Sequence, residues 1–217
     1  MPELKRVPAV DGLALDPKHP NLSLFSGNDF GYRCGVIGCA LSHYRLWRLT
    51  ADECSSQSVS AVFEDDAWFS ARFQDLWDTV MSSRLPEDFD LVYLGGLLGP
   101  QTWHELESVA RDTGGHIEIP PSVYCASQIS ESFAIPSKVQ FCTYSYILSG
   151  RGAKKLCDLV TRDGIKKAID WFLIDRWPEL RVYVTTPILC WSVSQEGSDI
   201  FGRMETVTVA LEGATEC

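Results

Sequence analysis

Short apolar runs alternate with amphipathic stretches along most of the chain, and this alternation constrains the fold more than any other feature of the sequence. Runs rich in β-branched and aromatic residues predict strands, whereas apolar residues spaced three to four positions apart predict helices. The predicted strands are 58–63, 90–94, 141–148, 181–185 and 188–191, with shorter candidates at 116–119 and 123–126. The predicted helices are 37–49, one capped by Ser70, one capped by Ser149, and 166–174. Alternation of this kind predicts an α/β fold with a mostly parallel central sheet.

The length of 217 residues suits a single domain that covers residues 1–217. Between about residues 97 and 137 the periodic pattern weakens, because prolines and glycines interrupt it. We expect this segment to be an elaborated loop region, where binding surfaces commonly lie.

Composition and charge exclude several classes of protein. Nineteen basic against twenty-nine acidic side chains give a net charge of −10, the wrong sign for a nucleic-acid binder. No apolar run is long enough to span a membrane, and the first residues lack the pattern of a signal peptide. The eight cysteines show no zinc-site spacing and predict a reducing compartment. We therefore expect a cytoplasmic protein of a bacterium or of a virus-infected host, and a fragment of a lumenal protein is the alternative.

Three consecutive acids, Glu64, Asp65 and Asp66, follow the predicted strand 58–63. Ligands of open α/β sheets bind beyond the carboxyl ends of the strands, where these acids stand. Carboxylates packed this closely repel one another, and a hard divalent cation such as Mn²⁺ or Mg²⁺ relieves the repulsion. Such a cation keeps positions open for a diphosphate and stabilises the charge on a departing nucleotide. The alternative interpretation is a solvated turn.

A glycine-containing segment, residues 35–43, precedes and enters the first predicted helix. Gly38 leads into that helix, so free backbone N–H groups there are candidates for contact with an anionic ligand. Ser42 and His43 lie about one turn further along. A single histidine in a helix is more often a structural hydrogen-bonding group than a catalyst, and the glycine spacing matches no nucleotide-binding fingerprint.

Together these segments resemble glycosyltransferase family 25, which contains bacterial lipooligosaccharide galactosyltransferases and collagen galactosyltransferases. The residues that carry the resemblance are Arg-Val-Pro-Ala-Val-Asp-Gly at 6–12, Gly-Val-Ile-Gly-Cys-Ala-Leu-Ser-His-Tyr-Arg-Leu-Trp at 35–47, Val-Phe-Glu-Asp-Asp-Ala at 62–67, Asp-Leu-Val-Tyr-Leu-Gly at 90–95, Tyr-Ile-Leu-Ser at 146–149, Gly-Ala-Lys-Lys-Leu at 152–156, Ile-Asp at 169–170, Gln195, and Ser-Asp-Ile at 198–200. They follow the order of the family and span most of the chain.

The resemblance implies a GT-A-type fold and an inverting, metal-assisted transfer of a hexose, galactose or glucose, from a UDP-sugar to a hydroxyl of a glycan or glycoprotein acceptor. It implies Glu64 and Asp66 as ligands of Mn²⁺ or Mg²⁺, and Asp170 as the general base. The donor-binding residues that it implies are Asp11, Gly38, Ser42, His43, Asp65, Gln195, Ser198 and Asp199. For Asp170 the alternative is a surface acid beside Lys166 and Lys167. Trp103, in the loop region, is a candidate contact for the acceptor sugar, since a flat aromatic ring packs well against the C–H face of a pyranose.

Members of the family usually begin with a strand and an arginine-rich turn ahead of the segment that corresponds to residues 6–12, whereas this sequence starts at Met1. We expect weaker donor binding and an open sheet edge that favours a homo-oligomer. Two other functions compete with an active transferase. One is a catalytically silent relative that binds a partner or glycan, and the other is a metal-dependent phosphohydrolase, for which the sequence offers no further His/Asp cluster.

Overall fold

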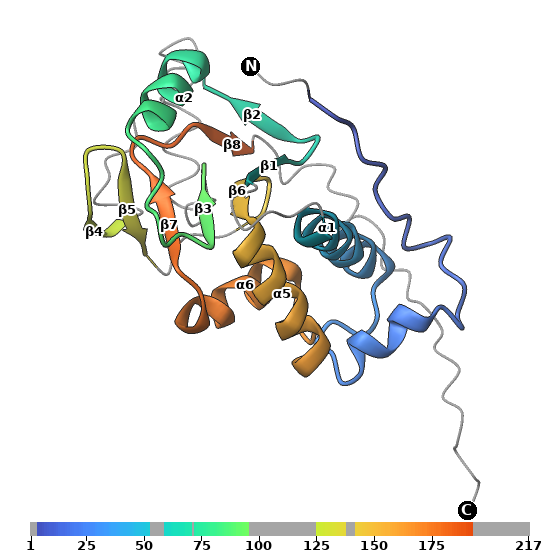
Figure 1. Ribbon diagram of the computed structural model, residues 1–217. Coiled ribbons are helices and arrows are strands. Elements are labelled where there is room, and N and C mark those ends of the chain that lie inside the picture. Colours follow the sequence, from blue (N-terminus) through green and yellow to red (C-terminus); the bar gives the residue numbers. More distant parts are fainter. Residues whose placement is uncertain (1–3, 53–58, 71, 96–124, 138–141, 193–217) are drawn as a thin grey trace, which may run out of the picture.

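The computed structural model describes residues 4–52, 59–70, 72–95, 125–137 and 142–192 (Figure 1). In chain order the elements are η1 (Pro20–Phe25), α1 (Cys34–Asp52), β1 (Val59–Phe63), β2 (Ala67–Phe69), α2 (Phe73–Ser82), β3 (Leu91–Tyr93), β4 (Cys125–Gln128), β5 (Phe133–Pro136), β6 (Ser145–Ser149), α5 (Gly150–Asp163), α6 (Ile169–Arg176), η2 (Trp177–Glu179), β7 (Val182–Thr185) and β8 (Cys190–Ser192). The predicted α/β class is confirmed. Strands β2 and β5 are additions that the sequence pattern did not predict.

The central sheet has six strands in the order β1-β6-β3-β7-β5-β4, and β2 and β8 form a separate two-stranded sheet. Only the β3–β7 pair among the described strands is parallel, and the other pairs are antiparallel. The prediction of a mostly parallel sheet is therefore wrong. The narrower prediction of a GT-A-type fold stays a prediction.

The position of β6 explains this error. β1 and β3 run in the same direction, as expected for strands joined by a helical crossover, because both are antiparallel to β6. They are not neighbours, however, since β6 lies between them. A pattern of alternating strands and helices indicates the direction of successive strands, but it does not decide which strands pair.

Helices cover both faces of the central sheet (Figure 1). On one face α1, α5 and α6 form the larger core, which takes in Tyr146 and Leu148 of β6. On the other face α2 packs over a smaller core that contains Ile147 of the same strand. Successive side chains of a strand point to opposite faces, so β6 contributes to both cores and is buried along its whole length.

The β6–α5 junction confirms the predicted cap of α5, whereas the predicted Ser70 cap is wrong, because α2 begins at Phe73 with Arg72 at its N-cap. Ser149 caps α5, because its Oγ accepts a hydrogen bond from the backbone N–H of Gly152 at 3.0 Å. A Cβ on Gly152 would lie only 2.2 Å from the carbonyl oxygen of Asp90, so only glycine allows the helix to approach β3 this closely.

Asp90, just before β3, has a fully buried side chain that is surrounded by donors. Its carboxylate accepts hydrogen bonds from Arg151 Nε at 2.9 Å, Lys155 Nζ at 2.6 Å and the backbone N–H of Arg181 at 2.9 Å. These contacts tie β3 to α5 and to the segment that enters β7. The carboxylate thereby joins three parts of the chain that are distant in sequence.

Two further predictions concern the surface and the thiols. Within the described part of the chain, none of the helices is both long and apolar enough to cross a membrane. The apolar runs around Cys157 and Cys190 predict small buried side chains, and Cys190 is buried whereas Cys157 is only partly buried.

Candidate functional site

The acidic segment lies at the carboxyl end of β1, as predicted, and forms a turn. The N–H of Glu64 donates to the carbonyl of Tyr144 at 2.9 Å, which continues the pairing of β1 with the chain that enters β6. The N–H of Ala67 donates to the carbonyl of Glu64 at 3.2 Å and closes a turn whose central residues are Asp65 and Asp66. Both central side chains are exposed, whereas Glu64 is half-buried.

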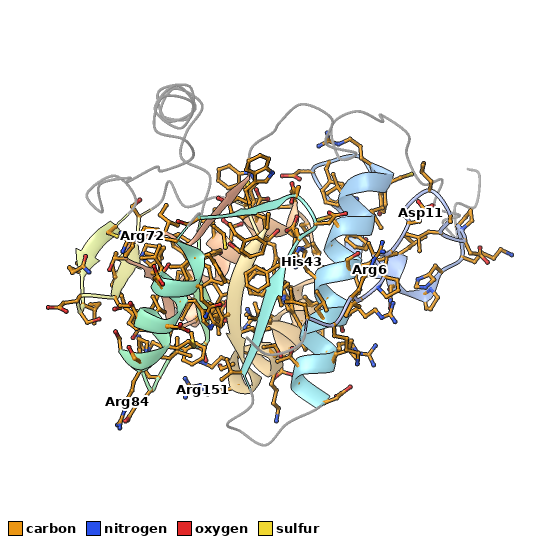
Figure 2. All side chains as sticks on the ribbon, turned by 90° about the horizontal axis from the view of Figure 1, so that it is seen from above. Arg6, Asp11, His43, Arg72, Arg84 and Arg151 are labelled. Atoms are coloured by element: carbon orange, nitrogen blue, oxygen red, sulfur yellow. The ribbon has the colours of Figure 1, made fainter. Side chains whose placement is uncertain are left out.

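His43 of α1 reaches this turn from one side (Figure 2). Its Nε2 lies 3.0 Å from Glu64 Oε1, and its side chain is 5% exposed. The hydroxyl of Thr143, just ahead of β6, donates to the same oxygen at 2.6 Å. Helix α1 and strand β6 therefore hold one carboxylate oxygen of Glu64 between them.

A second pair of side chains lies behind His43. Its Nδ1 is 2.9 Å from the hydroxyl of Tyr146, and that hydroxyl also accepts a hydrogen bond from Trp47 Nε1 at 3.0 Å. Tyr146 and Trp47 are fully buried. A continuous chain of hydrogen bonds thus leads from the core to the acidic turn.

These contacts decide the charge of Glu64. Burial by itself raises the pKa of this carboxyl, but the hydrogen bonds from His43 and Thr143 outweigh burial and hold the pKa below its ordinary value. Glu64 is therefore a carboxylate at neutral pH. Both of its described side-chain partners contact Oε1.

Asp170 lies in the first turn of α6 and shows the opposite shift. Burial raises its pKa, and the negative charge of Glu64 adds to the rise. Backbone N–H groups, including that of Trp171 at 2.8 Å, offset only part of this effect. The structure thus brings Asp170 into electrostatic range of Glu64, and it gives two carboxyl groups of one site different proton affinities.

Two thiols share the same surroundings. Burial, followed by the charges of the nearby acids, raises the pKa of Cys142 to about 12 and that of Cys39 well above its usual range. Sequence reasoning missed both thiols as neighbours of the site. Cys39 had a usable signal, since it precedes His43 by four positions and so lies on the same face of α1.

Comparison with known proteins covers the part of the chain that contains this site. Residues 33–173 match the model of glycosyltransferase family 25 (LPS biosynthesis protein). The chain belongs to glycosyltransferase family 25. The matched residues include His43 of α1, Glu64 and Asp66 of the acidic turn, and Asp170 of α6.

Relatives with curated names match parts of the chain. A protein of Acanthamoeba polyphaga mimivirus is 39% identical over 79 residues, which are 36% of this chain and 24% of that protein. Procollagen galactosyltransferase 1-A of Xenopus laevis is 31% identical over 126 residues, 56% of this chain and 17% of its own length. Inactive glycosyltransferase 25 family member 3 of Mus musculus is 34% identical over 99 residues, 41% of this chain and 16% of its own length. The chain thus spans less than a quarter of these relatives.

The donor-site residues that the family resemblance implies fall into separate groups. His43 lies in the site, whereas Ser42 next to it faces the N-terminal segment: its Oγ accepts a hydrogen bond from the N–H of Val10 at 2.8 Å and donates to the carbonyl of Gly38 at 2.7 Å. Asp11 is exposed and accepts a hydrogen bond from the N–H of Leu13 at 2.9 Å. Figure 2 shows Asp11 beyond α1, on the side away from His43.

Gly38 lies in the second turn of α1, because the helix begins at Cys34 and not near residue 37. Its N–H is therefore part of the helix interior and not one of the free groups at the start. A Cβ at this position would lie 2.6 Å from the carbonyl oxygen of Val10, so the glycine permits close contact with the N-terminal segment. This is a packing role, and a role in donor binding stays a prediction.

Other predicted residues lie outside the described parts of the chain. These are Gln195, Ser198 and Asp199 of the donor site and Trp103 of the acceptor site. Conversely, the hydrogen-bonding roles of Thr143, Tyr146 and Trp47 were not predicted. Trp47 is confirmed as a core residue, and its indole N–H gives it a polar contact as well.

The fit of a divalent cation can be judged from the acids of the turn. Within the described residues, no group of three or more His, Cys, Asp or Glu side chains has the geometry of a metal site. The turn itself offers oxygen ligands, namely the exposed carboxylates of Asp65 and Asp66 and the second oxygen of Glu64. Mg²⁺-like cations commonly bind one or two carboxylates and complete their shell with water and substrate phosphates, and this donor set suits that mode.

Proposed function

We propose that the chain transfers a hexose from a UDP-sugar to a hydroxyl group of a glycan or glycoprotein acceptor, with inversion at the anomeric carbon. The observation that carries this proposal is the pair of carboxyl groups, Glu64 and Asp170, which interact and whose pKa values shift in opposite directions. Galactose is the first hexose to test, since the family includes relatives named procollagen galactosyltransferases.

Asp170 is the general base of the proposed reaction. The acceptor oxygen forms a bond to C1 of the hexose while the bond from C1 to the diphosphate oxygen breaks, and the bonding pair leaves with UDP. Asp170 takes the proton that the acceptor hydroxyl loses, and a raised pKa makes its carboxylate a stronger base. A single displacement of this kind inverts the configuration at C1.

The acidic turn is the proposed donor side of the site. Asp66, together with Glu64 through its second oxygen, would hold Mn²⁺ or Mg²⁺, and a bound cation would neutralise charge on the departing diphosphate. His43 and Thr143 keep Glu64 ionised and in place for this role. Asp65, Asp11, Gly38 and Ser42, together with Gln195, Ser198 and Asp199, complete the proposed donor set.

The test is release of UDP from UDP-galactose and UDP-glucose with Mn²⁺, in the presence of galactose- or glucose-terminated acceptors. Asp170→Asn should lose transfer, whereas Asp175→Asn, the same substitution on α6, should retain it. Asp175 is half-exposed and, among the described residues, forms a surface ion pair with Lys167 at 2.8 Å, so it is a matched control. Equal activity of both variants, or no turnover by a folded wild-type protein, would contradict the proposal.

A silent relative that binds without transfer is the second candidate function. The similarity to a mouse relative named inactive favours it. Calorimetric titration of UDP, with and without Mn²⁺, separates the two when it is combined with the turnover assay. Manganese-dependent binding that a Glu64→Ala, Asp66→Ala double variant loses, without turnover of any UDP-hexose, would support the silent function.

A further inference from the structure

Two fully buried side chains behind the site, Tyr146 and Trp47, have no part in the proposed reaction. The indole N–H of Trp47 contacts the hydroxyl of Tyr146, and that hydroxyl contacts Nδ1 of His43. Buried aromatic residues commonly satisfy their N–H or O–H groups wherever a partner is near. Here the partners form an ordered series that ends on Glu64, so the direction of each hydrogen bond has a consequence at the site.

The direction of these bonds follows from the chemistry of the groups. An indole N–H can only donate, so the Tyr146 oxygen accepts from Trp47 at 3.0 Å. The hydroxyl proton of Tyr146 is then available for Nδ1 of His43, 2.9 Å away. An Nδ1 that accepts leaves the ring proton on Nε2, which donates to Glu64 Oε1 at 3.0 Å.

The opposite tautomer would be unfavourable at both ends of the imidazole. With the ring proton on Nδ1, the Nε2 lone pair would face a carboxylate oxygen at 3.0 Å. The hydroxyl proton of Tyr146 would also lose its acceptor in the core, where an unsatisfied polar group is costly. The arrangement of Trp47 and Tyr146 therefore selects one tautomer.

We propose that Trp47 and Tyr146 are positioning residues that fix the Nε2–H tautomer of His43 and thereby the orientation of Glu64. In that orientation Oε1 is engaged by His43 and Thr143, and Oε2 is the oxygen presented to a ligand. That this ligand is a UDP-sugar with its cation rests on the function proposed above. The selection of the tautomer itself does not depend on that function.

Ring packing keeps the series rigid and connects it to the other carboxyl group. The indole of Trp47 stacks on Phe172, with 6.2 Å between ring centroids and an interplanar angle of 24°. The rings of His43 and Tyr146 lie 5.7 Å apart. Phe172 follows Asp170 by two positions on α6. The side chains that orient Glu64 therefore also pack on the helix that carries Asp170.

The test compares Tyr146→Phe with Tyr93→Phe. Tyr93 pairs with Tyr146 on the neighbouring strand, is equally buried and belongs to the same core, so its substitution is a matched control. Long-range ¹H–¹⁵N NMR spectra, with His43→Gln to assign the imidazole signals, should show only the Nε2–H tautomer in wild type and in Tyr93→Phe. Tyr146→Phe should show the Nδ1–H form as well.

The kinetic measurement follows the donor. Tyr146→Phe should raise KM for the UDP-sugar by about tenfold, a usual effect of losing a partner that orients a ligand-binding group, and leave the KM of the acceptor unchanged. Trp47→Phe, which removes the indole N–H together with part of the ring volume, should act in the same direction if Tyr146→Phe does not fold.

Several outcomes would overturn the inference. They are an Nδ1–H tautomer in wild type, or variants at Tyr146 and Trp47 with the same tautomer as Tyr93→Phe. The inference would also be overturned if Tyr146→Phe no longer holds His43 in the Nε2–H tautomer but keeps the wild-type KM for the UDP-sugar. If wild type turns over no UDP-hexose, the proposed function fails, and the NMR comparison still decides whether these residues select the tautomer.

Discussion

Two carboxylates, Asp90 and Glu64, lie at opposite ends of β6 and differ in their partners. The N–H of Ser149, at the carboxyl end of the strand, donates to the carbonyl of Asp90, and the N–H of Glu64 donates to that of Tyr144 just before the other end. Asp90 is surrounded by Arg151, Lys155 and a backbone N–H. Glu64 receives an imidazole N–H and a hydroxyl instead.

The difference distinguishes a structural carboxylate from one that can bind a ligand. The charge of Asp90 is balanced by two cations within the protein. In the part of the chain that the structure describes, neither Glu64 nor Asp170 forms an ion pair with a lysine or arginine, although both are acids of the same site. The two carboxylates differ in burial, since Asp90 is fully buried and Glu64 is half-buried, and they also differ in the charge of their partners.

The largest expected effect is on catalysis at the Glu64 end. Asp170→Asn should lower the rate of hexose transfer by about 10²–10⁴-fold, the usual contribution of a general base, because the amide cannot accept the proton. Initial-rate measurement of UDP release checks this against Asp175→Asn. An equally large fall in kcat per folded molecule for Asp90→Asn would contradict the distinction between the two ends of β6.

The next effect is on stability at the Asp90 end. Asp90→Asn should lower the free energy of unfolding by about 2–3 kcal/mol, since it removes charge-assisted hydrogen bonds whose donors are partly exposed. Urea denaturation measures the change. Asp88→Asn is the control. Within the described parts of the chain, this exposed neighbour forms a long ion pair with Arg181 and a hydrogen bond from Tyr183, and its substitution should change stability by at most about 0.5 kcal/mol.

The two ends should also respond to pH with opposite signs. Burial raises the pKa of Asp90, but the bonds from Lys155, Arg181 and Arg151 outweigh it and lower the pKa. Its stabilisation is therefore present above the unfolded value of about 3.9 and is lost as the pH falls through the folded pKa. The raised pKa of Asp170 has the reverse effect: its stabilisation is present below about 3.9 and is lost as the pH rises through the folded pKa.

Unfolding curves of Asp90→Asn and Asp170→Asn between pH 3 and pH 8 would show this contrast. The deficit of Asp90→Asn relative to wild type should shrink toward low pH. Asp170→Asn should be more stable than wild type by about 1 kcal/mol at neutral pH, because no charged group is then buried, and should lose that gain in acid. Parallel pH dependences for the two variants would contradict the assignment.

How much of this the sequence could predict differs between the local and the long-range features. The Ser149 cap and the place of the acidic segment at the end of β1 depend on neighbouring residues and were predicted correctly. The insertion of β6 between β1 and β3 could not be predicted, since an apolar run carries no information about its partners. The contact of His43 with Tyr146 joins residues 103 positions apart, and Tyr146 lies in a run in which any buried residue would look the same.

The smallest expected effect concerns Thr143. Thr143→Val removes one hydrogen bond of 2.6 Å to Glu64 and keeps the shape of the side chain, so it should cost about 0.5–1 kcal/mol of stability. The pKa of Glu64 should rise as a result. Differential scanning calorimetry measures the stability, and titration of UDP with Mn²⁺ should show binding weakened by about two- to threefold, which about 0.5 kcal/mol produces. Unchanged binding would show that Glu64 does not need this donor.

The insertion of β6 also sets the order in which the protein can be built. β1 and β3 are synthesised early, but both pair with β6 and not with each other. The backbone groups that they direct toward β6 therefore have no strand partner until residues 145–149 have left the ribosome. Sheets that depend on such distant pairings fold slowly, because long loops must close before the contacts form. The bond from Thr143 to Glu64 spans 79 positions and cannot form earlier. A nascent chain that has passed residue 66 therefore carries its acidic segment for some time before any sheet exists to organise it.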